Sequence, residues 1–202
     1  GTLLAGGIVV PCNPHYVARE LTHQLRDAEA MFIVTSQRGA ELVSQVQADT
    51  SVKQFIVAEE GTYLAPQLRS KDGPDLSPYR TKGKDGTVVS GSDWNYFQDV
   101  LEVDPVDDAC IANIDMDDTA VLMYTGGTTG VSKGAQLTHR NIQANAVQFA
   151  TWLHLAYAEE RILTSLPLFH SYGMTTCMNV AIWSAAGMIL ISDPRNVAHI
   201  LE

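Results

Sequence analysis

A glycine- and threonine-rich segment, residues 124–134, holds the residue types best suited to chemistry in this sequence. It runs Tyr-Thr-Gly-Gly-Thr-Thr-Gly-Val-Ser-Lys-Gly, with Lys133 near its end. Glycines allow consecutive backbone N–H groups to converge on an anion, because no side chain blocks the approach. Threonine hydroxyls add hydrogen-bond donors, and a lysine supplies a mobile positive charge. This combination predicts a loop that binds a polyphosphate.

The spacing of this segment differs from the two commonest nucleotide-binding motifs. A Walker A loop has Gly directly before its Lys and Ser or Thr directly after it, whereas Ser132 and Gly134 flank Lys133. The GxGxxG spacing of a dinucleotide fold is absent too. A P-loop NTPase is therefore disfavoured, and from these residues alone a glycine-rich hairpin without a ligand remains an alternative.

The elements on both sides of this segment predict an α/β fold. Residues 1–58 predict a β-α-β-α-β run with elements at 7–11, 19–28, 31–35, 39–48 and 55–58. Residues 109–202 predict strands at 119–124, 135–138, 161–166 and 188–191, and an apolar helix at 173–186. Such alternation is typical of parallel-rich sheets with helices on their faces.

One further helix is predicted to start at Thr138, a good N-cap residue, and to follow the strand at 135–138. Its apolar face is predicted to contain Ile142, Ala146, Phe149, Trp152 and Leu153. Near this helix start, His139 and Arg140 are expected to be structural. Asp117 and Asp118, just before the strand at 119–124, are expected to be solvated charges.

Residues 59–108 are predicted to be an irregular insertion or linker with one helix. Glycines and prolines gather between Ser70 and Asp93, a composition typical of loops. Ser92 or Asp93 is expected to cap a helix through Trp94 to Leu101. The chain is thus divided into residues 1–58, 59–108 and 109–202.

A second motif lies at residues 166–173, Leu-Pro-Leu-Phe-His-Ser-Tyr-Gly. Together with the segment that begins at Tyr124, it resembles the core motifs of the adenylate-forming superfamily, which includes acyl-CoA synthetases, luciferases and peptide-synthetase adenylation domains. Residues 6–14 and 19–21 look like the N-terminal strand and helix of that superfamily. Ile191 to Arg195 is similar to a stretch of bacterial long-chain fatty-acid–CoA ligases.

The resemblance implies the large N-terminal domain of such an enzyme. Its members join a carboxylate to ATP, release pyrophosphate, and pass the acyl group to coenzyme A, with Mg²⁺ on the phosphates. Lys133 and His170 are the implied catalytic residues, His170 lying beside the carboxylate. The implied ATP-binding residues are Thr125, Gly126, Gly127, Thr128, Thr129, Gly130 and Lys133. Candidates for an acyl channel are Tyr172, Met174 and Trp183. No residue is implied to bind a metal directly.

The later motifs of the superfamily, which bind adenine and ribose and supply the C-terminal lysine, are not found in these 202 residues. The chain therefore looks like a fragment of a fatty-acid–CoA ligase that is inactive alone and self-associates through surfaces exposed by truncation. Two alternatives stay open: another adenylate-forming ligase, such as an aryl-CoA ligase or a peptide-synthetase adenylation domain, and a non-catalytic nucleotide-binding module.

Composition excludes several other classes. The chain has 13 Lys and Arg against 23 Asp and Glu, a net charge of −10, which argues against nucleic-acid binding. Its three cysteines are too far apart in sequence for a disulfide framework or a zinc motif. No apolar stretch is long enough to cross a bilayer. We expect a cytoplasmic protein, with peripheral binding at the inner membrane left open.

Overall fold

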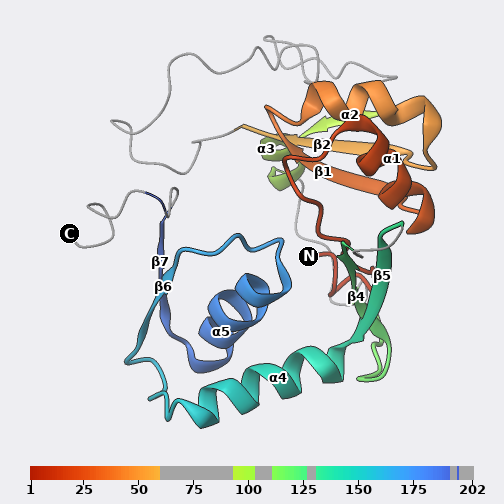
Figure 1. Cartoon of the computed structure of the whole chain (residues 1–202). Helices are drawn as coiled ribbons and strands as arrows, with labels where there is room; N and C mark the ends of the chain where they lie inside the picture. The colour runs from red at the N-terminus through yellow and green to blue at the C-terminus, as the bar shows by residue number, and fades with distance from the viewer. Residues whose placement is uncertain (60–92, 103–110, 127–130, 192–194, 196–202) are drawn as a thin grey trace. The chain divides into compact units, whose positions relative to one another are not determined.

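The computed structural model describes residues 1–59, 93–102, 111–126, 131–191 and 195. The chain divides into two compact units, one made of Gly1–Asn13 with Ala109–Glu202 and the other of Pro14–Asp108 (Figure 1). Both units combine helices with strands, which confirms the α/β class. Within the described ranges, no helix is long and apolar enough to cross a membrane. The glycine- and proline-rich residues 70–92 lie outside these ranges.

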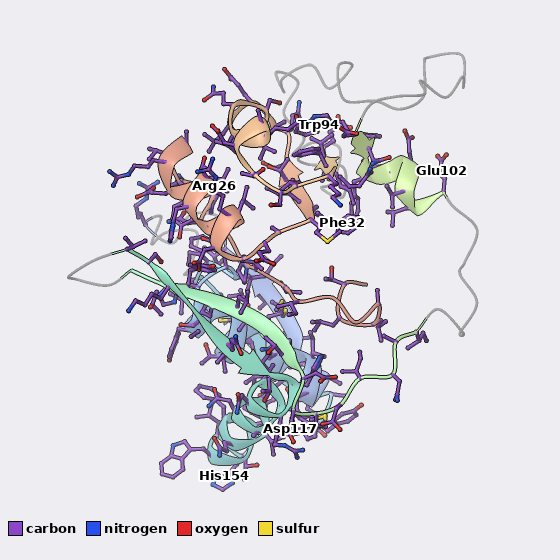
Figure 2. The ribbon with its side chains drawn as sticks, turned by 90° about the vertical axis from the view of Figure 1, so that its right-hand side faces the viewer. Arg26, Phe32, Trp94, Glu102, Asp117 and His154 are labelled. Atoms are coloured by element: carbon purple, nitrogen blue, oxygen red, sulfur yellow. The ribbon has the colours of Figure 1, made fainter. Side chains whose placement is uncertain are left out.

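The unit Pro14–Asp108 is built on a parallel sheet. Its strands are, in sheet order, β1 (Phe32–Ser36), β2 (Gln54–Ala58) and β3 (Trp94–Tyr96). Its helices are α1 (Ala18–Asp27), α2 (Ala40–Val46), the 3₁₀ turn η1 (Gln47–Asp49) and α3 (Phe97–Leu101). Figure 2 labels Arg26 on α1, Phe32 on β1 and Trp94 on β3. The two helices and two strands predicted between residues 19 and 58 are confirmed, with ends shifted by one or two residues.

The prediction of a helix through Trp94–Leu101 is wrong in its first half. Trp94 and Tyr96 pair with Phe55 and Val57 of β2, so this segment is the third strand of the sheet. The rings of Trp94 and Phe55 stack with centroids 4.9 Å apart. Trp94 and Tyr96 are both buried on one face of β3. This burial stabilises the strand more than local helix propensity would stabilise a helix over the same residues.

In the other unit, an antiparallel hairpin joins β4 (Thr119–Thr125) to β5 (Lys133–Thr138). Val9 bridges Val121 of β4 in parallel: its N–H donates to Ala120 at 2.9 Å and its carbonyl accepts from Leu122 at 2.9 Å. The strand predicted at 7–11 is therefore a single bridge beside β4. It does not join the sheet of β1 and β2, although it precedes them in sequence.

The rest of this unit is a β-α-β arrangement and a long helix. The parallel strands β6 (Arg161–Thr164) and β7 (Gly187–Leu190) are connected through a π-helix, η5 (Gly173–Asn179), and a short helix, α5 (Val180–Ser184). Helix α4 (His139–Trp152) packs against both η5 and α5. The predicted apolar helix at 173–186 is thus confirmed as helical, but about half of it has π geometry.

The apolar face predicted for α4 is only partly buried. Ile142, Ala146 and Phe149 pack in the core of the unit. Trp152 and Leu153, in contrast, are 83% and 50% exposed. They lie at the end of α4, and the 3.6-residue period that placed them on the face does not reveal where the packed neighbours stop.

Two of the three cysteines can be placed, and neither of these two forms a disulfide. Cys177 is buried in η5. Burial raises the pKa of Cys12 to about 11, so this side chain stays a neutral thiol at neutral pH. Both residues therefore act as small, weakly polar side chains. Cys110 lies outside the described residues.

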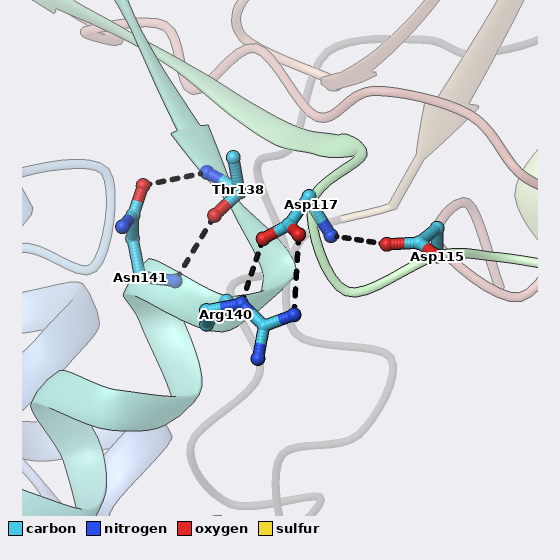
Figure 3. Close-up of polar contacts among 5 residues, drawn as sticks. All are labelled: Asp115, Asp117, Thr138, Arg140 and Asn141. Carbon is cyan, nitrogen blue, oxygen red and sulfur yellow. Dashed lines mark hydrogen bonds and ion pairs between the residues drawn. The ribbon is translucent and has the colours of Figure 1, made fainter.

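Thr138 caps α4 as predicted (Figure 3). Its hydroxyl accepts from the N–H of Asn141 at 3.1 Å, and the Asn141 side chain accepts from the N–H of Thr138 at 3.1 Å. We expect Thr138→Ala to lower the free energy of unfolding by about 1 kcal/mol, because one helix N–H loses its acceptor. Urea denaturation would measure this. Thr151→Ala, an exposed threonine in the last turn of α4, is the matched control, and an equal loss in both variants would contradict the capping role.

Candidate active site

The candidate phosphate-binding segment lies at the open end of the β4–β5 hairpin. Thr125, the last residue of β4, pairs with Lys133, the first residue of β5. The Ser132 hydroxyl donates to the Thr125 carbonyl at 2.9 Å and so ties the two strand ends together. Thr125, Gly126 and Lys133 are exposed. The other predicted ATP-binding residues, Gly127, Thr128, Thr129 and Gly130, lie outside the described residues.

Close packing fixes the backbone next to Lys133. Gly134 lies directly across from Tyr124, and a Cβ atom at Gly134 would be 3.0 Å from Cε2 and 3.1 Å from Cζ of the tyrosine ring. Only a glycine lets the ring lie this close to the strand. The Tyr124 ring therefore packs over Gly134 and restrains the strand immediately after Lys133.

The Lys133 ammonium group is available to a ligand. The side chain is exposed, and no acidic residue in the part of the chain that the structure describes forms an ion pair with it. A lysine on a flexible stem at the end of a strand can reach an anion held by the adjacent loop.

The alternation of side chains along β4 determines which face carries Thr125 and Lys133. Thr125, Met123 and Val121 lie on one face of the hairpin, because every second residue of a strand points the same way. Val121 and Met123 belong to the same buried cluster as Met174 of η5. Met174, in the helical segment that follows His170, therefore shares a buried cluster with residues of the strand that ends at Thr125.

Hydrogen bonds hold the backbone of His170 and orient its ring. Its backbone N–H donates to the Pro167 carbonyl at 3.1 Å, and its ring Nδ1 accepts from the backbone N–H of Tyr172 at 3.2 Å. The side chain is otherwise exposed. The turn is tight, because a Cβ atom at Gly173 would lie 2.4 Å from the Pro167 carbonyl oxygen. The backbone of this turn is thus closely packed, and one hydrogen bond orients the imidazole.

An apolar pocket of about 310 Å³ lies between α4 and α5. Its lining residues are Leu3, Met116, His139, Ile142, Gln143, Ala146, Asn179, Ile182 and Trp183. Of the three acyl-channel candidates, Trp183 lines this pocket. Met174 is instead part of the core, and Tyr172 is 56% exposed and lies outside the lining.

The segment before β4 is joined to the start of α4 by an ion pair. Arg140 donates to the two carboxylate oxygens of Asp117 at 2.7 Å and 3.2 Å (Figure 3). The Asp115 carboxylate accepts from the Asp117 N–H at 2.9 Å and the Asp118 carboxylate from the Asp115 N–H at 2.8 Å. Asp117 is solvated as expected, since its side chain is 70% exposed, and it is also paired with Arg140; the structural role expected for Arg140 is confirmed. The ion pair links the residues before β4 to those after β5, at the end of the hairpin opposite to Lys133.

This ion pair should make stability depend on pH. The hydrogen bond from Arg140, together with its charge, lowers the pKa of Asp117. A carboxyl whose pKa is lowered by folding stabilises the folded state above its unfolded pKa, about 3.9, and loses that contribution as the pH falls through the folded value. We expect Asp117→Asn to lower the melting temperature slightly at pH 7 and low salt, and not at pH 2. Thermal melts of Glu159→Gln, another exposed acid, provide the control; a difference that persists at pH 2 would contradict the electrostatic cause.

The sequence over its whole length, residues 1–202, matches the family described as AMP-binding enzyme. The chain belongs to this family. It is 35% identical over 215 residues to a long-chain-fatty-acid–CoA ligase of Bacillus subtilis, and 36% identical over 228 residues to one of Yersinia pestis. Each alignment covers all of this chain and 36% of the relative, so the chain spans about a third of the length of these relatives.

Solved structures agree on the fold. An anthranilate CoA ligase in complex with anthranoyl-AMP superposes with a TM-score of 0.73 at 17% identity, over 99% of this chain and 33% of that protein. A long-chain-fatty-acid–CoA ligase of Archaeoglobus fulgidus gives a TM-score of 0.56 at 30% identity, over 90% of this chain and 29% of that protein. The resemblance to the adenylate-forming superfamily is confirmed.

Sequence reasoning missed several residues that support the site. Ser132 forms a side-chain hydrogen bond to the Thr125 carbonyl, and the Tyr124 ring and Gly173 are closely packed. Tyr172 donates its backbone N–H to the His170 ring. Gly134 and Gly173 do stand out in the sequence, since each follows a candidate catalytic residue within three positions. Nothing in the sequence identifies the atoms that make a glycine necessary there.

Proposed function

We propose that the protein carrying this sequence is an ATP-dependent fatty-acid–CoA ligase. Its first reaction would join a carboxylate to the α-phosphate of ATP and release pyrophosphate; its second would transfer the acyl group to the thiol of coenzyme A. The family membership and the names of the curated relatives support an acid–thiol ligase. The fatty-acid substrate is proposed from the names of those relatives.

The hairpin end suits the triphosphate of ATP. The exposed Thr125 hydroxyl and Gly126 amide, with Gly127 to Gly130, would hold the β- and γ-phosphates, and Lys133 would neutralise charge on the departing pyrophosphate. The described residues contain no group of three or more metal-ligating side chains. Mg²⁺ is proposed to be held through the phosphates, where it would withdraw charge from the oxygens of the leaving group.

His170 and the pocket between α4 and α5 suit the carboxylate and its chain. His170 would hydrogen-bond a carboxylate oxygen. The helix after His170 continues into α5, whose Ile182 and Trp183 line the apolar pocket with Ile142 of α4. An acyl chain that extends from His170 into this pocket would bury apolar surface.

One observation carries the proposal: residues of β4, the strand that ends at Thr125, belong to the same buried cluster as Met174, which follows His170 by four residues. The proposed phosphate-binding end and the proposed carboxylate-binding turn would thereby be connected through one buried cluster. Two anions that repel in solution could then be held in a fixed geometry for attack, which supplies much of the rate of such reactions.

Pyrophosphate exchange tests this function. The full-length protein that carries this sequence is mixed with Mg·ATP, labelled pyrophosphate and one carboxylate at a time: a saturated fatty acid, benzoate or an amino acid. We expect exchange with the fatty acid, and acyl-CoA once coenzyme A is added. Exchange with benzoate or the amino acid alone would indicate another adenylate-forming ligase. ATP binding without exchange for any carboxylate would indicate a non-catalytic module and contradict the proposal.

Residues 1–202 alone are proposed to be inactive, because the adenosine-binding motifs of the superfamily are not among them. The same assay on that segment tests this. Self-association, which light scattering would measure, a cytoplasmic location and peripheral membrane binding stay predictions.

A further inference from the structure

The helical segment that follows His170 has a backbone geometry that is rare in proteins. Gly173–Asn179 (η5) is a π-helix of 7 residues. At its end, the Val180 N–H donates to the carbonyls of Cys177 and Thr175, and Thr175 lies five residues earlier, the spacing of a π-helix. π geometry usually covers a single turn within an α-helix and is frequent at functional sites. This segment is therefore a candidate for a functional role of its own.

The buried side chains of this segment also fit an α-helix. Four buried residues of η5 and α5 follow one another at intervals of three, four and three: Met174, Cys177, Ala181 and Ser184. This spacing places them on one face of an α-helix. An α-helix over the same residues would bury the same face, so burial does not by itself select the π form.

A side-chain hydrogen bond favours the π form. The Thr176 hydroxyl donates to the Tyr172 carbonyl, four residues earlier, at 2.8 Å. In an α-helix this carbonyl accepts from the N–H of Thr176, whereas in a π-helix it accepts from the N–H of Cys177. A threonine hydroxyl that bonds the carbonyl four residues earlier competes with the α-helical backbone bond to that carbonyl. Loss of the hydroxyl should therefore shift η5 toward the α form.

The two forms of η5 differ in length. A π-helix has more residues per turn than an α-helix and rises less per residue, so conversion to the α form lengthens the segment. The end of η5 next to α5 is anchored, because Val180 and Ala181 are buried. Conversion would therefore move the opposite end, which is the turn that carries His170.

The length of η5 affects how the proposed substrate would fit. Asn179, the last residue of η5, lines the apolar pocket together with Ile182 and Trp183, whereas His170 lies before the first residue of η5. A fatty acid with its carboxylate at His170 and its chain in the pocket would extend along η5. Such a ligand would bind the two forms with different affinities, which is the condition for a ligand to shift a conformational equilibrium.

We propose that η5 is a length-adjusting switch between a π form, which accepts short acyl chains, and a longer α form, which accepts long ones. The identity of the ligand rests on the proposed function, whereas the existence of two forms of η5 does not. A long chain selects the α form from its population in the free protein, and the turn that carries His170 moves with it.

Crystal structures of the full-length protein test the two forms directly. With laurate bound, we expect an α-helix, in which the Val180 N–H donates to the Thr176 carbonyl. With hexanoate bound, we expect the π-helical bond to Thr175. A π-helix in the laurate complex would overturn the proposal. A protein whose laurate complex has the α form, yet which forms no acyl-CoA, would contradict the proposed function and support the switch.

The Thr176 hydroxyl provides a second test. Thr176→Val keeps the shape of the side chain but removes the bond that favours the π form. Loss of one such bond shifts an equilibrium about fivefold. In titration calorimetry, we therefore expect the ratio of laurate affinity to hexanoate affinity to rise about fivefold. Thr176→Ser retains the hydroxyl and should retain the wild-type ratio. An unchanged ratio in Thr176→Val would contradict the switch.

Ser44→Ala is the matched control for this change. The Ser44 hydroxyl donates to the Ala40 carbonyl, also four residues earlier, at 2.9 Å, but it does so in helix α2 of the other unit. Its loss should leave the ratio of the two affinities unchanged. A change as large as that in Thr176→Val would show that such bonds act through overall stability and not through the form of η5, and it would overturn the proposal.

Discussion

Lys133→Ala should lower the rate of acyl-adenylate formation on the order of 10²-fold, the effect typical of losing one charge or donor from a site where negative charge develops. The lysine begins β5 directly across from Thr125, its side chain is exposed, and no described acid pairs with it. Its charge can therefore act on the ligand. Pyrophosphate exchange on the full-length protein, with saturating fatty acid, would measure the loss.

Lys53→Ala is the matched control, since Lys53 is also exposed but lies in the other unit, before β2. It should retain the wild-type rate. Lys133→Arg should recover part of the loss if charge is what matters, although its planar group is not equivalent to a compact ammonium. A Lys133→Ala rate within twofold to threefold of wild type would remove Lys133 from the proposed mechanism.

The fold could be predicted from sequence wherever one local pattern decided the structure. The helices and strands between residues 19 and 58, and the Thr138 cap, follow from periodicity and from a side chain that bonds its own backbone neighbours. The predictions failed where a distant partner decided. Trp94 lies in a strand, where its ring stacks on the ring of Phe55 from β2. Val9 forms a parallel bridge with Val121 of β4, which is more than 100 residues away in sequence.

The candidate site shows the same limit. Residue types and their order predicted the phosphate-binding segment, Lys133 and His170. They could not predict the ring of Tyr124 over Gly134, the bond from the Tyr172 amide to His170, or the π geometry of η5. Each of these depends on close contacts between particular atoms, whose positions the sequence does not determine. The roles of the site residues themselves stay proposals.

Gly173→Ala should have the second large effect, because it changes the turn that holds His170. A Cβ atom at this position would lie 2.4 Å from the Pro167 carbonyl oxygen and 3.2 Å from that of Leu166. Both atoms are backbone, so the turn itself has to move. Such overpacking typically costs about 1–3 kcal/mol of stability. The Pro167 carbonyl also accepts from His170, so its displacement moves the imidazole as well.

Activity should fall further than stability alone would explain. A misplacement of about 1 Å at a reacting group can cost on the order of 10²-fold in rate. We therefore expect a folded Gly173→Ala protein, checked by its melting temperature, to bind Mg·ATP in calorimetric titration as the wild type does. Its acyl-CoA formation should be reduced by about that factor.

Gly187→Ala is the matched control for this change. Gly187 begins β7 in the same unit, and a Cβ atom there would lie 3.6 Å from Arg161 Cγ and 4.0 Å from the Glu160 carbonyl oxygen, both ordinary contact distances. This variant should keep the wild-type melting temperature and rate. If Gly173→Ala did the same, the turn would not need a glycine, and the proposal that this turn positions His170 would have to be abandoned.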